Sequence, residues 1–367
     1  MIKPFITNFF MDSLGKFLII ITIYLASQLE NEQVLRYFLI SSAIIAIYVE
    51  SFANYTLHVS IKKQENPFIN LNLVFILVLG IAVHLFFQIN LTLNLLLVIL
   101  LAVLFYPLLF KRVTHQYKEE FAYVAFLNFI RPLIFFLSVL LIIFSFIEPV
   151  NFLLNVIFLL ALISVPLILT LYKRVKFSDI NKDIISYLFL IGLFGQIDYL
   201  ISDFIYGVDI SNKIGSLIRY ASIPLMIITA SNTIIFPLVK RRKINTSVIY
   251  FFLTFSSVLL MYFGIEFINA LVGDSSVYLI YSFLMIVSSF IIIFSVNKRL
   301  NLFIANGGHS ILAKFYLTLS ASKIILFLAL NEIMNFYLIL GLSYLISSFS
   351  IILFIKHHER KGNLNLL

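Results

Sequence analysis

Ten charged residues lie inside long apolar stretches of this 367-residue sequence. The five cations are Lys16, Arg131, Arg219, Lys314 and Lys323, and the five acids are Asp12, Glu50, Asp198, Asp203 and Glu266. On insertion scales a charged side chain at the centre of a bilayer costs roughly 2.5–3.5 kcal/mol, so such residues face a bundle interior or a wet cavity. They are therefore the candidates for binding a charged substrate or carrying a proton.

Two of the cations, Arg131 and Lys323, lie at equivalent places in the fifth and eleventh apolar segments. Guanidinium and ammonium groups bind phosphate and carboxylate oxygens. With Lys16 in the first segment and Arg219 in the eighth, they predict a cationic interior that binds an anionic substrate, such as a pyrophosphate or a carboxylated sugar. The alternative is a set of structural ion pairs with the intramembrane acids. Lys314 lies about one turn inside its segment, so its ammonium can also reach the cytoplasmic surface.

The acids indicate a second kind of chemistry, which is coupling to a proton. Glu50 lies well inside the second segment, where a carboxyl group could carry a coupling proton. Asp198 and Asp203 lie in the outer half of the seventh segment, and Arg219 lies in the outer third of the eighth. An aspartate to Arg219 pair across this hairpin is therefore expected, with either a structural or a functional role.

Several other chemistries find no support in the sequence. It contains no cysteine, which excludes a disulfide, a thiol nucleophile and a cysteine-based zinc site. His357 and His358 have no further ligand nearby at metal spacing, and no Walker lysine, Gly-x-Ser-x-Gly or His-Glu-x-x-His motif is present. We therefore expect no metal, no cofactor and no enzymatic activity. The net charge of +9 is dispersed over short loops, which argues against nucleic-acid binding.

Membrane-spanning helices are the elements that must position these charges. Hydrophobic residues make up 62% of the sequence and charged residues 12%, whereas soluble domains are about half apolar and about a quarter charged. The apolar stretches have the length of roughly 20 residues that a helix needs to cross a bilayer, and the alternating pattern of a barrel is missing. The sequence predicts an all-α membrane protein of about twelve spans, at 8–29, 37–60, 67–88, 91–110, 121–147, 152–172, 184–206, 214–239, 246–268, 275–296, 310–330 and 333–355.

The distribution of lysine and arginine among the short loops predicts the orientation. Nineteen of these residues lie in alternate loops and the two tails, whereas Arg36 and Lys213 lie in the intervening loops. Because basic residues are retained on the cytoplasmic side, both termini are expected to be cytoplasmic. The midpoint loop divides the chain into two six-helix halves, 1–175 and 176–367, in the same orientation, which suits a parallel pseudo-two-fold repeat.

Four stretches around the seventh to eleventh segments carry a family resemblance. Gly-Gln-Ile-Asp-Tyr-Leu-Ile-Ser-Asp-Phe-Ile-Tyr-Gly at 195–207 is followed by Ile-Gly-Ser-Leu-Ile-Arg-Tyr-Ala at 214–221 and Ile-Ile-Phe-Pro at 234–237. This region resembles the start of the second half of polysaccharide flippases of the Wzx type, in the MOP exporter superfamily. The region from Gly273 through Gly308 is similar to the ninth-to-eleventh-span region of that family.

The resemblance implies a flippase that moves an undecaprenyl-pyrophosphate-linked oligosaccharide to the outer leaflet of a bacterial inner membrane. It would work by alternating access around the cationic cavity, in surface polysaccharide and lipopolysaccharide biosynthesis. Its partners would be the lipid-linked oligosaccharide, membrane lipids, and the polymerase and glycosyltransferases of the same pathway.

Two other functions remain open at this point. A cation-coupled small-molecule antiporter of the same superfamily would have acids dominating its cavity, whereas here the cations and acids within spans are five each. A membrane glycosyltransferase or polymerase could place acids in the first outer loop, where Glu30 and Glu32 lie. Such enzymes usually carry a sizeable outer loop to hold the acceptor, and this chain has none among its predicted connections.

Overall fold

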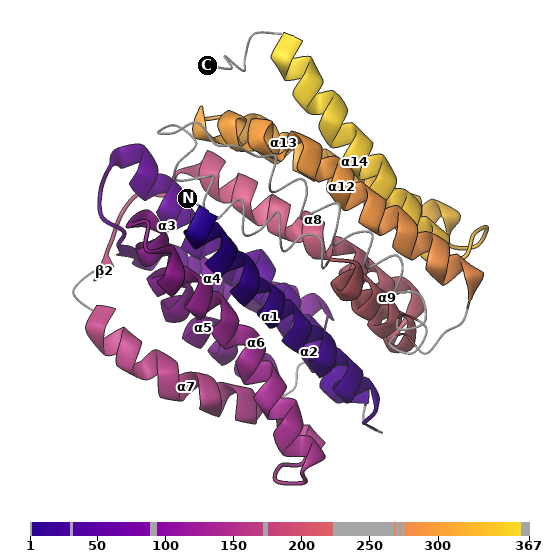
Figure 1. Ribbon diagram of the computed structural model, residues 1–367, viewed down its shortest axis with the longest axis horizontal. Coiled ribbons are helices and arrows are strands. Elements are labelled where there is room, and N and C mark those ends of the chain that lie inside the picture. The colour runs from indigo at the N-terminus through magenta and orange to yellow at the C-terminus, as the bar shows by residue number, and fades with distance from the viewer. Residues whose placement is uncertain are drawn as a thin grey trace. The chain divides into compact units, whose positions relative to one another are not determined.

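The computed structural model of the chain consists almost entirely of helices (Figure 1). It describes residues 2–29, 32–88, 94–171, 175–222 and 276–360, together with Ile268 and Val272. The chain divides into two compact units. We call Phe10–Gln196 the N-terminal unit, and Ile197–Leu367 together with Met1–Phe9 the C-terminal unit.

The helices before the boundary at Gln196 follow the apolar segments of the first half. They are α1 (Ile2–Ser27), α2 (Glu32–Ile44), the π-helix η1 (Ile45–Val49), α3 (Glu50–Lys63), α4 (Leu71–Gln88), α5 (Asn94–Tyr117), α6 (Phe121–Ile143), the 3-10 turn η2 (Pro149–Asn151) and α7 (Phe152–Leu171). The next helix, α8 (Lys182–Tyr206), begins in the N-terminal unit and ends in the C-terminal unit.

Helix α5 forms the core of the N-terminal unit, because it contacts α2, α3, α4, α6 and α7. Its side chains Phe105 and Phe110 are fully buried. Phe105 stacks on Phe135 of α6, and Phe135 meets Phe38 of α2 edge to face. Offset and edge-to-face ring contacts add to the stability gained by burying the rings. This aromatic cluster holds α2 and α6 against α5, and α6 contains Arg131, which is described below.

Helices α2 and α3 form one continuous rod that is interrupted by the π-helix. No loop separates the elements, since Ile44 and Glu50 on either side of η1 have right-handed helical backbone angles. The rod ends at Gln64, which has a left-handed φ of 59° and follows Lys62 and Lys63. Single π-turns within α-helices are rare and occur frequently at functional sites. The residue directly after this one is Glu50.

A short parallel bridge pairs β1 (Ile69–Asn70) with β2 (Val175–Lys176) at the ends of two loops of the N-terminal unit. Asn70 is 2% exposed and its side-chain amide donates a hydrogen bond of 2.9 Å to the carbonyl of Ser178. Its side-chain oxygen accepts one of 3.1 Å from the backbone N–H of Asn72. Asn70 therefore connects the start of α4 to the loop that precedes α8.

We expect Asn70→Ala to loosen this connection. The substitution removes two hydrogen bonds at a buried position, which costs about 1–3 kcal/mol. Hydrogen–deuterium exchange should increase over residues 175–181 and leave α5 unchanged. Asn72→Ala is the matched control, because its amide donates to the same carbonyl from an exposed position. Equal exchange in the two variants would contradict the assigned role of Asn70.

The C-terminal unit contains the end of α8 and four further described helices. These are α9 (Val208–Ala221), α12 (Val277–Ala305), α13 (His309–Leu330) and α14 (Phe336–Arg360). Gly207 separates α8 from α9 with a φ of +83°, a left-handed conformation that glycine adopts without strain.

Helices α12 and α14 pack along each other (Figure 1). Small residues allow their close approach: a Cβ placed on Gly341 would lie 2.8 Å from the sulfur of Met285 and 3.1 Å from Cα of Ser282. Both helices also contain buried serines, at positions 282, 289, 343, 347 and 348. Interfaces of this kind are typical of helices in lipid, where close van der Waals packing replaces hydrophobic association.

The part of the chain that the structure describes contains eight helices long and apolar enough to cross a membrane. Together with the composition, they identify a multi-pass membrane protein. The eighth predicted segment begins earlier than expected, since α9 starts at Val208 rather than at residue 214 and places Lys213 within a helix. Most of the predicted spans 214–239 and 246–268 lies outside the described residues. The count of twelve, the cytoplasmic termini and the boundary at 175/176 stay predictions.

Candidate functional site

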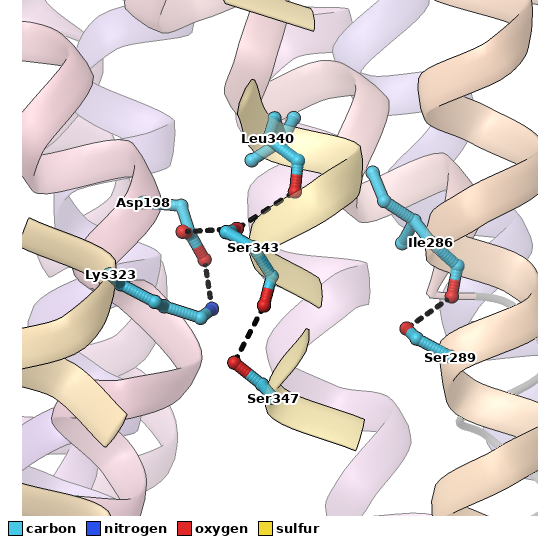
Figure 2. Close-up of polar contacts among 7 residues, drawn as sticks. All are labelled: Asp198, Ile286, Ser289, Lys323, Leu340, Ser343 and Ser347. Carbon is cyan, nitrogen blue, oxygen red and sulfur yellow. Dashed lines mark hydrogen bonds and ion pairs between the residues drawn. The ribbon is translucent and has the colours of Figure 1, made fainter. Parts of the chain in front are cut away.

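A buried ion pair forms the centre of the C-terminal unit. The ammonium nitrogen of Lys323 on α13 lies 2.5 Å from Oδ2 of Asp198 on α8 (Figure 2). The side chains are 2% and 0% exposed, respectively. Both residues lie well inside helices that qualify as membrane spans. A charge in such a place needs a partner, and here each charge neutralises the other.

Helix α14 completes the surroundings of this pair. The Ser343 hydroxyl lies 3.4 Å from Oδ1 of Asp198 and also donates to the carbonyl of Leu340 (Figure 2). The ring of Tyr344 lies 4.2 Å from the Lys323 nitrogen, which is within range of a cation–π interaction. The ammonium group is therefore held by a carboxylate and an aromatic ring from two different helices.

A second ion pair lies in the N-terminal unit, between Arg131 of α6 and Glu50 of α3. Its side chains are 25% and 28% exposed, so this pair is partly accessible, whereas the pair of Lys323 and Asp198 is buried. Glu50 follows the π-helix directly, and Arg131 precedes Pro132 within α6. Pro132 in turn packs against α1, because a Cβ on Gly15 would lie 3.3 Å from its Cγ. The accessible pair therefore lies beside a π-turn in one helix and a proline in the other.

The pairing of the predicted site residues in the structure differs from the expected cationic interior. Arg131 and Lys323 are each bound to an intramembrane acid, as in the ion-pair alternative. An aspartate was expected to pair with Arg219, but Asp198 pairs with Lys323. Asp203 accepts a hydrogen bond of 3.2 Å from Ser211. Arg219 lies in the last turn of α9.

Some predicted residues fall outside the structural description. The side chains of Lys16 and Asp12 and all of Glu266 are among them. Lys314 is exposed on α13. Within the described residues, no group of three or more histidine, cysteine, aspartate or glutamate side chains could hold a metal ion.

Three features of the sites were not predicted from the sequence: Ser343, Tyr344 and the π-helix before Glu50. The first two share a signal, because Ser343 and Ser347 lie four residues apart on one face of α14 and the hydroxyl of Ser347 donates to the carbonyl of Ser343. A polar face within an apolar segment could have indicated that α14 lines a polar interior. The π-helix has no signal of this kind, since its residues, Ile-Ala-Ile-Tyr-Val, are ordinary for a span.

We expect Arg131→Ala to impair function much more than stability. Because both side chains are partly exposed, losing this pair should lower the melting temperature less than losing a fully buried pair would. A guanidinium exposed to hydrocarbon would be costly, so we expect the exposed part of Arg131 to face a polar space in which it could bind a substrate. Transport should fall at least about tenfold, the effect of losing about 1.4 kcal/mol of binding. Arg131→Lys, which keeps the charge and loses the planar fork, should give an intermediate rate. Unchanged transport in Arg131→Ala would remove this residue from the site.

Comparisons with known proteins give one fold likeness. No protein-family model matches the chain, and no curated protein matches it. The crystal structure of a MATE mutant superposes with a TM-score of 0.57 at 10% sequence identity, covering 97% of this chain and 95% of the other. At this identity the likeness establishes the fold, which is MATE-like over nearly the whole length of both chains.

Proposed function

We propose that this chain is a membrane transporter of the MOP superfamily that moves its cargo by alternating access. The observation that carries the proposal is the MATE-like fold over 97% of the chain. Two compact units, each with an ion pair among its spans, suit a transporter that works by alternating access. We propose further that it has no enzymatic activity of its own.

The first candidate is a cation-coupled antiporter of small molecules. The fold neighbour supports it, and so does the charge pairing. The prediction of an anionic cargo rested on a cationic interior, but the positive charges of Arg131 and Lys323 are each compensated by a carboxylate. An interior of paired charges is better suited to ion coupling, in which a carboxylate exchanges partners, than to capturing a pyrophosphate.

The second candidate is the flippase for lipid-linked oligosaccharide in a bacterial inner membrane. It is favoured by the resemblance of residues 195–207 and 214–221 to Wzx-type flippases, and by the accessible Arg131, which can bind phosphate oxygens. In this case the polymerase and glycosyltransferases of the glycan pathway would be its partners.

Two assays run in parallel distinguish the candidates. The first measures efflux of a panel of fluorescent dyes from a pump-deficient bacterium, with ionophores that collapse the sodium or the proton gradient. The second measures restored surface polysaccharide in flippase-deficient strains. Lys323→Ala is tested in both, with Lys314→Ala as the matched control, because Lys314 is an exposed lysine on the same helix.

The outcomes separate clearly. Ionophore-sensitive efflux by the natural chain and by Lys314→Ala would support the antiporter, and a change of that efflux in folded Lys323→Ala would show that the buried ion pair takes part. Restored polysaccharide with the same pattern would support the flippase. Activity in neither assay, at membrane expression verified by immunoblot, would count against both cargo classes.

A further inference from the structure

The surroundings of Lys323 have the composition of a cation-binding site. Its ammonium lies against the Asp198 carboxylate at 2.5 Å and 4.2 Å from the centre of the Tyr344 ring, and 2% of its side chain is exposed. A carboxylate and an aromatic face in a sealed space are the groups that bind a desolvated ammonium ion. Here the occupant is supplied by the chain itself.

One hydroxyl oxygen beside Asp198 could bind an inorganic cation, and a second lies on the helix face of Lys323. The Ser343 hydroxyl already lies 3.4 Å from Oδ1 of Asp198. Ser320 lies three residues before Lys323, on the same face of α13, and its buried hydroxyl has no hydrogen-bond partner among the described residues. Carboxylate and hydroxyl oxygens are ligands that hard cations accept.

We propose that Lys323 is a tethered counter-ion that fills a monovalent-cation site built around Asp198. Its ammonium takes the place that a dissolved alkali cation would otherwise occupy next to this carboxylate. Any coupling that passes through Asp198 then requires neither sodium nor potassium. The proposed function enters only in this last step, where the cation is regarded as a coupling ion.

Removal of the lysine should leave Asp198 in need of another cation. Its carboxylate is then buried without its counter-charge, a state that is strongly unfavourable. An alkali cation can restore neutrality, and the volume vacated by the lysine side chain gives it room. A variant without Lys323 should therefore acquire a dependence on alkali cations that the natural chain lacks.

The test measures the melting temperature of the purified full-length chain at pH 8.5, where carboxyl groups in water are ionised. Sodium, lithium, potassium and choline chloride are compared at equal ionic strength. The natural chain should melt at the same temperature in all four salts. Lys323→Met should melt several degrees lower in choline and recover saturably with at least one alkali cation. The double variant Asp198→Leu with Lys323→Met should show no response to any cation.

Arg219 on α9 could act as a substitute counter-ion, because it is another cation of the same unit. The titration is therefore repeated on Lys323→Met combined with Arg219→Gln. If Lys323→Met can be purified only in the presence of one alkali salt, this requirement counts as a response to that cation. The proposal is supported if Lys323→Met, alone or combined with Arg219→Gln, responds to a cation and the variant Asp198→Leu with Lys323→Met does not.

Two results would overturn it. One is a saturable sodium or potassium response in the natural chain that Asp198→Asn abolishes. The other is the absence of any alkali response from both variants that lack Lys323 and keep Asp198, including failure to fold in every salt. Because no cargo is used, the result can be interpreted even if neither transport assay detects activity.

Discussion

Asp198→Ala should be the most damaging single substitution in the C-terminal unit among those proposed, with a loss of about 3–5 kcal/mol in the free energy of unfolding. The substitution leaves the ammonium of Lys323 in a space where 2% of the side chain is exposed. The loss is due mainly to this uncompensated charge, and less to the missing carboxylate atoms. Thermal unfolding of the protein in lipid nanodiscs measures it.

The control replaces both members of the pair by apolar side chains of similar size, Asp198→Leu with Lys323→Met. Apolar replacement of a whole buried ion pair is often neutral or stabilising by about 1–4 kcal/mol, so this double variant should be at least as stable as the natural chain. If it is as unstable as Asp198→Ala, packing and not charge determines the effect. A stable double variant that still transports would assign the pair a purely structural role.

Gly192→Leu should have the second large effect, through the contact between α8 and the π-helix. A Cβ on Gly192 would lie 3.0 Å from Cα of Ile47 and 3.1 Å from the carbonyl oxygen of Ala46. These backbone atoms cannot turn away as a side chain could. Overpacking of this kind typically costs about 1–3 kcal/mol. The substitution should lower the melting temperature and disturb the hydrogen bond of 2.8 Å from Ser51 to the carbonyl of Leu188.

The same helix offers a matched control in Gly195→Leu. A Cβ at Gly195 meets nothing within 4 Å, and replacing a helical glycine with leucine recovers about 0.5–1 kcal/mol of helix propensity. The same substitution three residues apart should therefore have opposite signs. Equal melting temperatures for the two variants would refute the close contact at Gly192.

Hydropathy and loop charges were sufficient to predict most of the described helices. The segment predicted at 121–147 corresponds to α6 at Phe121–Ile143, and the segment predicted at 152–172 corresponds to α7 at Phe152–Leu171. This succeeds because the length of a span is set by the thickness of the bilayer. The start of α9 was predicted too late because its first turns are polar and resemble a loop.

The partners of the charged residues were much less accessible to prediction. Sequence position gives the depth of a residue in the membrane, but it does not give the direction in which a helix face points. Asp198 and Asp203 were both candidates for a pair with Arg219 across a hairpin. The partner of Asp198 is instead Lys323, which is 125 residues away along the chain. Only the packing of α8, α13 and α14 decides between these two cations.

The π-helix at Ile45–Val49 also sets the direction in which Glu50 points. A π-turn contains one more residue than the α-turn it replaces, because its hydrogen bonds span five residues instead of four. Each residue advances an α-helix by about 100° around its axis, since a turn takes about 3.6 residues. Deletion of one residue from this stretch would therefore rotate α2 and α3 relative to each other by about 100°, and so turn Glu50 away from the face where it meets Arg131.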